Sequence, residues 1–164
     1  MNRKIFETCV TFFNHNTSAR YALHFIYKVL PIIIFVTYPA MLLRVFLFAP
    51  AELPKLVAVP LCVLVGVSLL RIIVNEKRPY ERYGQPSVFH KETKGKSFPS
   101  RHTASAFIIA MALLYFDPTW GILGLITALL IEISRILAGA HYIHDVVASM
   151  VISIVVGWIF FFVL

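Results

Sequence analysis

The sequence predicts an all-α protein, a polytopic transmembrane helix bundle with about five spanning helices and an interfacial helix at its amino terminus. Two observations lead to this class: 59% of the 164 residues are hydrophobic, and the mean hydropathy of +0.81 is too high for a soluble domain of this size. A third is that the apolar residues form long runs. We therefore expect residues 1–164 to form a single membrane-embedded domain.

Five stretches come close to the ~20 residues that a spanning helix needs. They are residues 30–49, 54–74, 99–117, 118–138 and 143–164. A strand assignment fails because runs such as residues 155–162 lack the alternation of a membrane barrel. Between the third and fourth spans, Asp117 is a good N-cap and Pro118 suits a first helical position, which predicts a tight reversal.

Two polar segments flank the first two spans. In residues 1–20, Phe6 and Val10 can line one face of a helix with Arg3 on its polar side, so we expect an interfacial helix on the membrane surface. The long connection after the second span, residues 75–97, contains the basic residues Lys77, Arg82, Lys91, Lys94 and Lys96. Such a loop typically contacts lipid headgroups, and guidance of an anionic substrate is the alternative.

Residues suited to phosphate chemistry lie at the ends of the spans. The connections after the second and fourth spans are two crossings apart, so they emerge on the same membrane face. On that face lie Arg71 and Arg78 at the end of the second span, Ser100 and His102 at the start of the third, Arg135 near the end of the fourth, and His141 and Asp145 at the start of the fifth. We expect all of them to converge on one pocket.

Three guanidiniums would suit a tetrahedral oxyanion, because each offers a fork of donors and a positive charge. Arg71 and Arg78 are seven residues apart, so both project from one face if the helix continues that far. Arg135 can complete the triangle. The alternative is that these arginines reach from helix ends to the interface. Ser100 begins a helix, where free backbone N–H groups form an anion seat, although a plain N-cap serine is the simpler interpretation.

His141 and Asp145 are four residues apart, so the carboxylate can accept the proton of one ring nitrogen and leave the other free to attack. His102 could then protonate the leaving alkoxide and later activate water. A metal site using His141, His144 and Asp145 is an alternative, but the three arginines would repel a divalent cation. We therefore expect no metal and no cofactor. Glu132 is expected to have a structural role, pairing with Arg135 or another polar group.

These stretches resemble the type 2 phosphatidic acid phosphatase family, with its motifs K-x6-R-P, P-S-G-H and S-R-x5-H-x3-D. The third motif matches fully at Ser134, Arg135, His141 and Asp145, and the others match at Arg78, Pro79, Pro99, Ser100 and His102. Arg71 stands where the family has lysine, and Arg101 where it has glycine.

The resemblance implies a metal-independent enzyme that hydrolyses a lipid phosphate or pyrophosphate through a phosphohistidine intermediate. His141 would be the nucleophile, Asp145 its orienting partner and His102 the general acid. The phosphate-binding set would be Arg71, Arg78, Ser100, Arg101 and Arg135. Membrane lipids and the lipid substrate are the expected partners, with no nucleic acid. The substrate could be undecaprenyl pyrophosphate, phosphatidylglycerophosphate or phosphatidate, and the oligomeric state is left open.

The resemblance also bears on topology and on competing functions. The family usually has six spans, so either the first span is missing or residues 1–28 form a short surface helix in its place. Its members commonly place the site outside the cytoplasm, and we expect an outward-facing site in the cell membrane, although the positive-inside rule points the other way. The alternatives are a catalytically silent lipid-phosphate-binding membrane protein and, because haloperoxidases have similar motifs, vanadate-dependent oxidation.

Overall fold

The computed structural model describes all 164 residues and contains helices without strands, which confirms the all-α prediction. The α-helices are α1 (Arg3–His15), α2 (Thr17–His24), α3 (Leu30–Phe48), α4 (Leu53–Val74), α5 (Pro79–Tyr83), α6 (Arg101–Phe116), α7 (Pro118–Leu137) and α8 (Ile143–Trp158). Short π-helical segments at Phe25–Val29 and Ile159–Val163 extend α2 and α8, and a 3₁₀ turn at Pro50–Glu52 joins α3 to α4.

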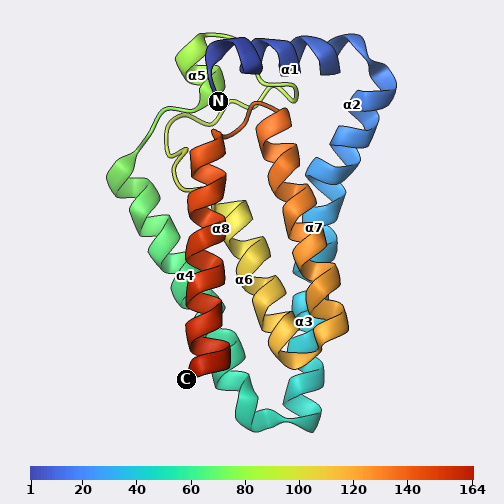
Figure 1. The fold of residues 1–164 in the computed structure, drawn as a ribbon, viewed down its shortest axis with the longest axis vertical. Helices are drawn as coiled ribbons and strands as arrows, with labels where there is room; N and C mark the ends of the chain where they lie inside the picture. Colours follow the sequence, from blue (N-terminus) through green and yellow to red (C-terminus); the bar gives the residue numbers. More distant parts are fainter.

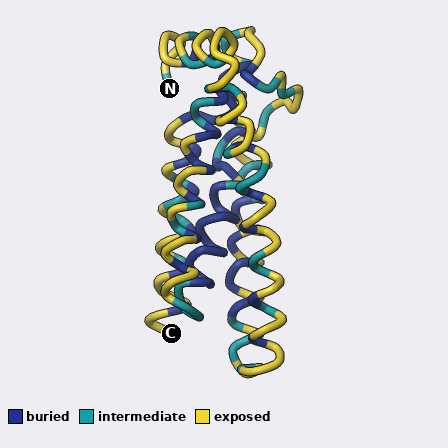
Figure 2. The backbone as a smooth tube through the Cα atoms, turned by 90° about the vertical axis from the view of Figure 1, so that its right-hand side faces the viewer, coloured by how far each residue is buried: buried dark blue, intermediate teal, exposed yellow.

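The long helices α3, α4, α6, α7 and α8 run side by side, and α6 lies in the middle of the bundle (Figure 1). Its residues are buried from Thr103 to Leu113, whereas the surrounding helices are exposed on their outer faces (Figure 2). Helix α7 comes close to α6 through Gly121, where an added Cβ would lie only 2.1 Å from the Cα of Leu114. Small residues allow such close contacts between membrane helices.

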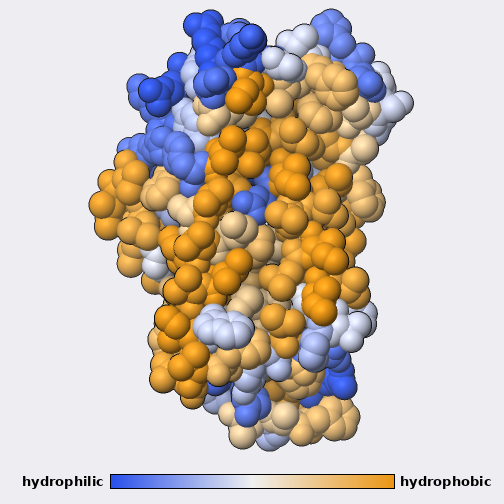
Figure 3. Space-filling view, viewed as in Figure 1, coloured by the Kyte–Doolittle hydropathy of each residue, from blue (hydrophilic) through white to orange (hydrophobic).

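The outer surface is that of an integral membrane protein. Leucine, isoleucine, valine and phenylalanine side chains are exposed along the bundle, and Figure 3 shows them as a broad apolar band between hydrophilic ends. Four apolar helical stretches are long enough to span: Thr17–Phe48, Pro50–Tyr83, Pro118–Leu137 and Ile143–Val163.

The third predicted span, residues 99–117, is shorter than the others. Helix α6 has 16 residues, which at 1.5 Å per residue gives about 24 Å, less than the ~30 Å hydrocarbon core. In Figure 1 its upper end lies below the upper ends of α7 and α8. The loop before α6 therefore enters the bundle. The residues at the start of α6 are recessed below the end of the bundle formed by α7 and α8.

The first span begins earlier than predicted, at Thr17 rather than at residue 30. Arg20 and His24 lower the local hydropathy, but Arg20 donates from its guanidinium to the backbone oxygen of Val88 at 3.2 Å, so these turns belong to the bundle. The prediction that residues 1–28 form a surface helix is therefore wrong for the second half of that segment. Only α1 lies across the end of the bundle (Figure 1).

Helix α1 turns its apolar face mainly toward the protein. Phe6 and Val10 are buried, and the Phe6 ring lies 5.3 Å from the Tyr83 ring. The same ring occupies the space where a side chain on Gly139 would be, 2.6 Å from an added Cβ. Ile5 and Phe12 remain exposed. The amino-terminal helix thus rests on the connection between α7 and α8.

The reversal predicted at Asp117 is confirmed. The Asp117 carboxylate accepts from the backbone N–H groups of Thr119 at 3.0 Å and of Trp120 at 3.3 Å, as an N-cap does. This turn fixes α7 antiparallel to α6 and so brings the end of α7 back to the recessed start of α6.

Candidate active site

His141 and Asp145 form a buried pair in the α7–α8 connection and the first turn of α8. The Nδ1 atom of His141 lies 3.2 Å from Oδ2 of Asp145, and the two side chains are 1% and 0% exposed. The same Oδ2 accepts from the Ser97 hydroxyl at 2.5 Å and from the Tyr142 backbone N–H at 2.9 Å. With three donors converging on it, the carboxylate fixes the ring of His141 and favours the proton on Nδ1.

The other nitrogen of His141 faces Arg78. The Nη1 atom of Arg78 lies 3.3 Å from Nε2, and because a guanidinium only donates, Nε2 is the acceptor. Burial lowers the pKa of His141 to about 4, against the opposing effect of its hydrogen bond to Asp145. At neutral pH the ring is therefore neutral, with a lone pair on Nε2, as a nucleophile requires.

Arg78 is held by backbone oxygens and not by a continued helix. Helix α4 ends at Val74 because Asn75 is left-handed, with φ of 43°, so the condition for Arg71 and Arg78 to share one helix is not met. Arg78 instead precedes α5, with Nε donating to the Gly95 oxygen at 3.1 Å and Nη1 to the Ala140 oxygen at 3.2 Å. Both acceptors lie on loops that enclose His141.

A central cavity of about 420 Å³ is lined by Arg78, the residue that contacts His141, whereas His141 itself is not among the lining residues. Its cationic lining residues are Arg71, Arg78, Lys91, Lys94, Lys96 and Arg101, with His102 beside them and no carboxylate among the lining residues. Arg71 is oriented by a 2.8 Å hydrogen bond from Nη1 to the Pro99 oxygen. Six cations around one cavity make a strongly electropositive site, which suits a phosphate or diphosphate.

Ser100 is fully buried and is not among the residues that line the central cavity. It precedes α6, and its backbone N–H donates to the backbone carbonyl oxygen of Asp145 at 3.1 Å. Its side chain does not cap the helix and instead accepts from the Thr103 hydroxyl at 2.9 Å. The Ser100 hydroxyl can therefore still donate its own proton.

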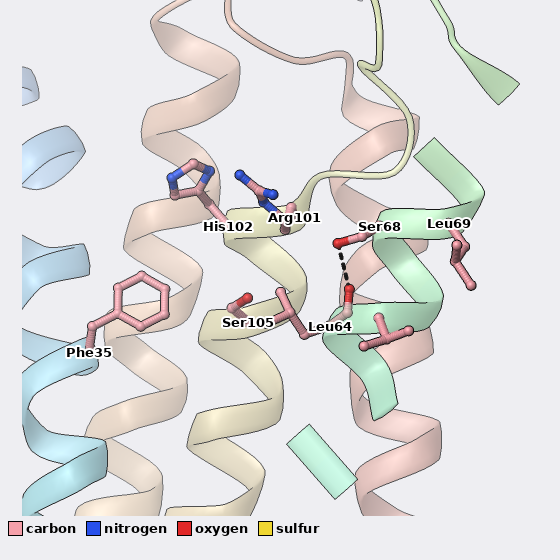
Figure 4. Close-up of a pocket in the computed structure, with 8 residues that line it drawn as sticks. Phe35, Leu64, Ser68, Leu69, Arg101, His102 and Ser105 are labelled. Carbon is pink, nitrogen blue, oxygen red and sulfur yellow. Dashed lines mark hydrogen bonds between the residues drawn. The ribbon is translucent and has the colours of Figure 1, made fainter. Parts of the chain in front are cut away.

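Arg101 and His102 begin α6 and face a second opening, the lateral groove between α3, α4 and α6. Figure 4 shows both side chains at the top of α6, with Phe35 of α3 on one side and Ser68 and Leu69 of α4 on the other. The groove has a volume of about 550 Å³ and is also lined by Leu64. His102 makes no hydrogen bond within the protein, so both of its ring nitrogens are available to a substrate.

Arg135 lies on the other side of His102, in a side cavity of about 560 Å³ that also contains Lys28 and Lys91. Arg135 is buried, and its guanidinium stacks on Tyr27, with Cζ 3.9 Å from the ring centre. The guanidinium also donates to the backbone oxygen of Tyr27 at 3.2 Å. The arginine triangle is thus split, because Arg135 does not line the cavity of Arg71 and Arg78. The expected pairing with Glu132 is absent, and Glu132 Oε2 has no hydrogen-bond partner.

The alternative metal site, with His141, His144 and Asp145 as ligands, is not formed in the structure. His141 faces Arg78, whereas Nε2 of His144 lies 3.1 Å from Glu76 Oε2 and 3.0 Å from Asp145 Oδ1. Glu76, His144 and Asp145 do bring ligand atoms within 4.8 Å of one another. In this arrangement His144 pairs with carboxylates and stacks on Tyr142 at 5.1 Å.

Comparison with known proteins identifies the family. Residues 52–164 match the PAP2 superfamily, which is more than half of the chain. The chain belongs to the PAP2 superfamily. Among curated relatives, undecaprenyl-diphosphatase BcrC of Bacillus subtilis (strain 168) is 30% identical over 98% of this chain and 83% of that protein.

Further similarities point to the same class. A lipid A 1-phosphatase of Rhizobium etli is 33% identical over 56% of this chain and 40% of that protein. The crystal structure of Aquifex aeolicus LpxE superposes with a TM-score of 0.65 at 25% identity, covering 85% of this chain and 92% of that one. The predictions of a PAP2-type fold and of an integral membrane lipid phosphatase are thereby confirmed at the level of family.

Two residues of the site could not be singled out from the sequence. Ser97 lies 48 residues before Asp145, and only the fold reveals its hydrogen bond to that carboxylate. Lys91 was one of several lysines in a basic loop, yet it alone among them lines both the central and the side cavity. A long-range contact of this kind leaves no periodicity or motif to read.

Proposed function

We propose that this PAP2 protein hydrolyses a polyprenyl-type lipid diphosphate and releases inorganic phosphate through a phosphohistidine at His141. The observation that carries the proposal is the Asp145–His141–Arg78 chain, in which Arg78 contacts Nε2 of a neutral imidazole and also lines a cationic cavity. Similarity to undecaprenyl-diphosphatase BcrC along nearly the whole chain supports the substrate class. Residues 1–164 would act as one phosphatase domain.

In the first half-reaction, Nε2 of His141 attacks the terminal phosphorus, so that an N–P bond forms as the bridging P–O bond breaks. Arg71, Arg78 and Ser100 donate to the equatorial oxygens, whose charge they offset in the transition state. His102 gives a proton to the departing lipid phosphate. The guanidiniums supply the charge stabilisation, so this route needs no metal ion.

In the second half-reaction, His102 takes a proton from a water molecule, whose oxygen attacks the phosphorus of the phosphohistidine. The N–P bond breaks, inorganic phosphate leaves, and Asp145 keeps His141 in the tautomer that can attack again. Arg135 and Arg101 add positive charge on two sides of His102. Both would stabilise the anionic leaving group.

The lipid chain would leave the site through the lateral groove. Its apolar lining includes Phe35, Leu64 and Leu69, which are also exposed on the outside of the bundle. A chain in this groove can remain in contact with the surrounding lipid while its headgroup reaches His102. We further propose that the protein lies in the cell membrane with this end facing outward.

The test is phosphate release from a polyprenyl diphosphate in detergent, in the presence of a metal chelator. We expect turnover by the wild-type protein and none by His141→Ala. Binding of the lipid without phosphate release would instead favour a silent lipid-phosphate-binding protein. Loss of activity on chelation would contradict the metal-independent mechanism. Labelling of single cysteines introduced at residue 94 or residue 55 in intact cells would test the outward orientation.

A further inference from the structure

Lys91 is held in place more firmly than a lysine of a surface loop. Its backbone N–H donates to the Ser87 hydroxyl at 3.0 Å, and the side chain is partly buried. Val88, three residues earlier, is fully buried. Its backbone N–H donates to the backbone oxygen of Ala138 at 3.1 Å, and its backbone oxygen accepts from the Arg20 guanidinium. The turn from residue 87 to residue 91 is therefore fixed to both α2 and the end of α7.

Lys91 lies at the junction of two cavities. The central cavity contains Arg71 and Arg78, and the side cavity contains Lys28 and Arg135. Only two residues line both cavities, and these are Lys91 and His102. Lys91 thus borders the same two cavities as His102, the proposed general acid.

No acidic residue offsets the charge of Lys91. It forms no ion pair, and neither cavity has a carboxylate among its lining residues. Burial, followed by repulsion from Arg78, Arg135 and Arg71, lowers its pKa to about 8. An uncompensated cation among arginines is costly unless an anion joins it, so the arrangement indicates a ligand with more negative charge than one phosphate carries.

We propose that Lys91 binds the phosphate that stays with the lipid when the terminal phosphate is transferred, and so selects diphosphates over monophosphates. This inference rests on the proposed function. Because the terminal phosphorus must lie next to Nε2 of His141 and the bridging oxygen next to His102, the second phosphate lies beside His102. Lys91 is the cation shared by the cavities that meet there.

The reaction clarifies why this contact affects rate as well as binding. When the bridging P–O bond breaks, its electron pair goes to the lipid phosphate, which gains charge before His102 protonates it. A lysine ammonium next to that phosphate stabilises the developing charge in the transition state. With a lipid monophosphate the leaving atom is an alkoxide oxygen, and there is no second phosphate for Lys91 to bind.

The experiment compares kcat/KM for a lipid diphosphate and the monophosphate of the same chain. For Lys91→Met we expect a loss of about 10- to 100-fold with the diphosphate, the effect of one charged hydrogen bond, and little change with the monophosphate. Lys91→Arg should recover most of the diphosphate activity. The matched control is Lys77→Met, an exposed lysine of the same connection that lines neither cavity, which should leave both activities unchanged.

The monophosphate activity of Lys91→Met also reports on folding, since an unfolded variant would lose both activities. Equal losses with both substrates, or no loss with the diphosphate, would overturn the role of Lys91. A wild-type protein that hydrolyses monophosphates only would also overturn it. A wild-type protein that hydrolyses neither would contradict the proposed function itself.

Discussion

The two halves of the site differ in how far the protein has already satisfied their polar groups. We call one half the floor; it consists of Arg78, Ser97, His141 and Asp145. These side chains are buried, and each has a hydrogen-bond partner within the protein. The other half, the mouth, is more open, and none of its side chains has such a partner within the protein: Lys91, Arg101 and His102.

The difference indicates a division of work. In the floor, His141, the proposed nucleophile, is oriented before substrate arrives, so its attack would need no rearrangement during reaction. In the proposed mechanism the mouth faces the leaving group, and its free donors and cations would gain partners only when the lipid headgroup binds. Substitutions in the floor should therefore affect every substrate alike, whereas those in the mouth should depend on the leaving group.

The largest effect is expected for the floor. His141→Ala removes the nucleophile, and we expect phosphate release to fall by about 10⁴-fold or more with lipid diphosphates and monophosphates alike. Acid-quenched protein should also lose the covalently bound phosphate. Normal trapping of phosphate by this variant would mean that another residue attacks, and the comparison of floor and mouth would fail.

The mouth is tested most sharply at His102. His102→Ala should slow hydrolysis of a lipid monophosphate by about 10³-fold, because the alkoxide would depart unprotonated. With an aryl phosphate, whose phenolate leaves readily without a proton, the loss should be far smaller. The measurement is the ratio of kcat values for the two substrates in wild type and variant. Equal losses would assign His102 to orientation rather than to proton transfer.

A smaller loss of activity is expected for Ser97→Ala, a substitution in the floor. It removes the 2.5 Å hydrogen bond to Asp145 but leaves those from His141 and the Tyr142 backbone. We expect kcat to fall by roughly 10-fold, as for the loss of one hydrogen bond to a charged group, independently of the leaving group. Ser97→Thr keeps the hydroxyl and should retain more activity. A substrate-dependent effect would place Ser97 with the mouth.

The membrane spans and the motif residues were predictable because they depend on local sequence. Apolar runs determine α4, α7 and α8, and the four-residue spacing of His141 and Asp145 predicted their contact, although His141 lies in the connection before α8 begins at Ile143. The start of the first span was missed because Arg20 and His24 look like surface residues until Arg20 is seen bonded to Val88. Local hydropathy cannot record such a contact.

The arrangement of cations around the site could not be predicted for a similar reason. Arg71 and Arg78 share a cavity although a helix end at Asn75 separates them. Arg135 instead faces the side cavity, because its guanidinium stacks on Tyr27, a residue 108 positions earlier in the chain. Packing between distant segments decides which cations meet, and the order of motifs along the sequence gives only the membrane face.

The smallest expected effect concerns pH and separates floor from mouth in one protein. Lys91 has its pKa lowered to about 8, so above that pH the free enzyme loses this charge from the mouth, and kcat/KM for a diphosphate should decline. A bound phosphate stabilises the charged form of Lys91 and so raises its pKa in the complex. The decline of kcat should therefore occur only at higher pH. In the floor, His141 has its pKa lowered to about 4, so its neutral form persists through this range. Lys91→Arg stays charged and should abolish the alkaline decline; a decline unchanged in this variant would assign it to another group.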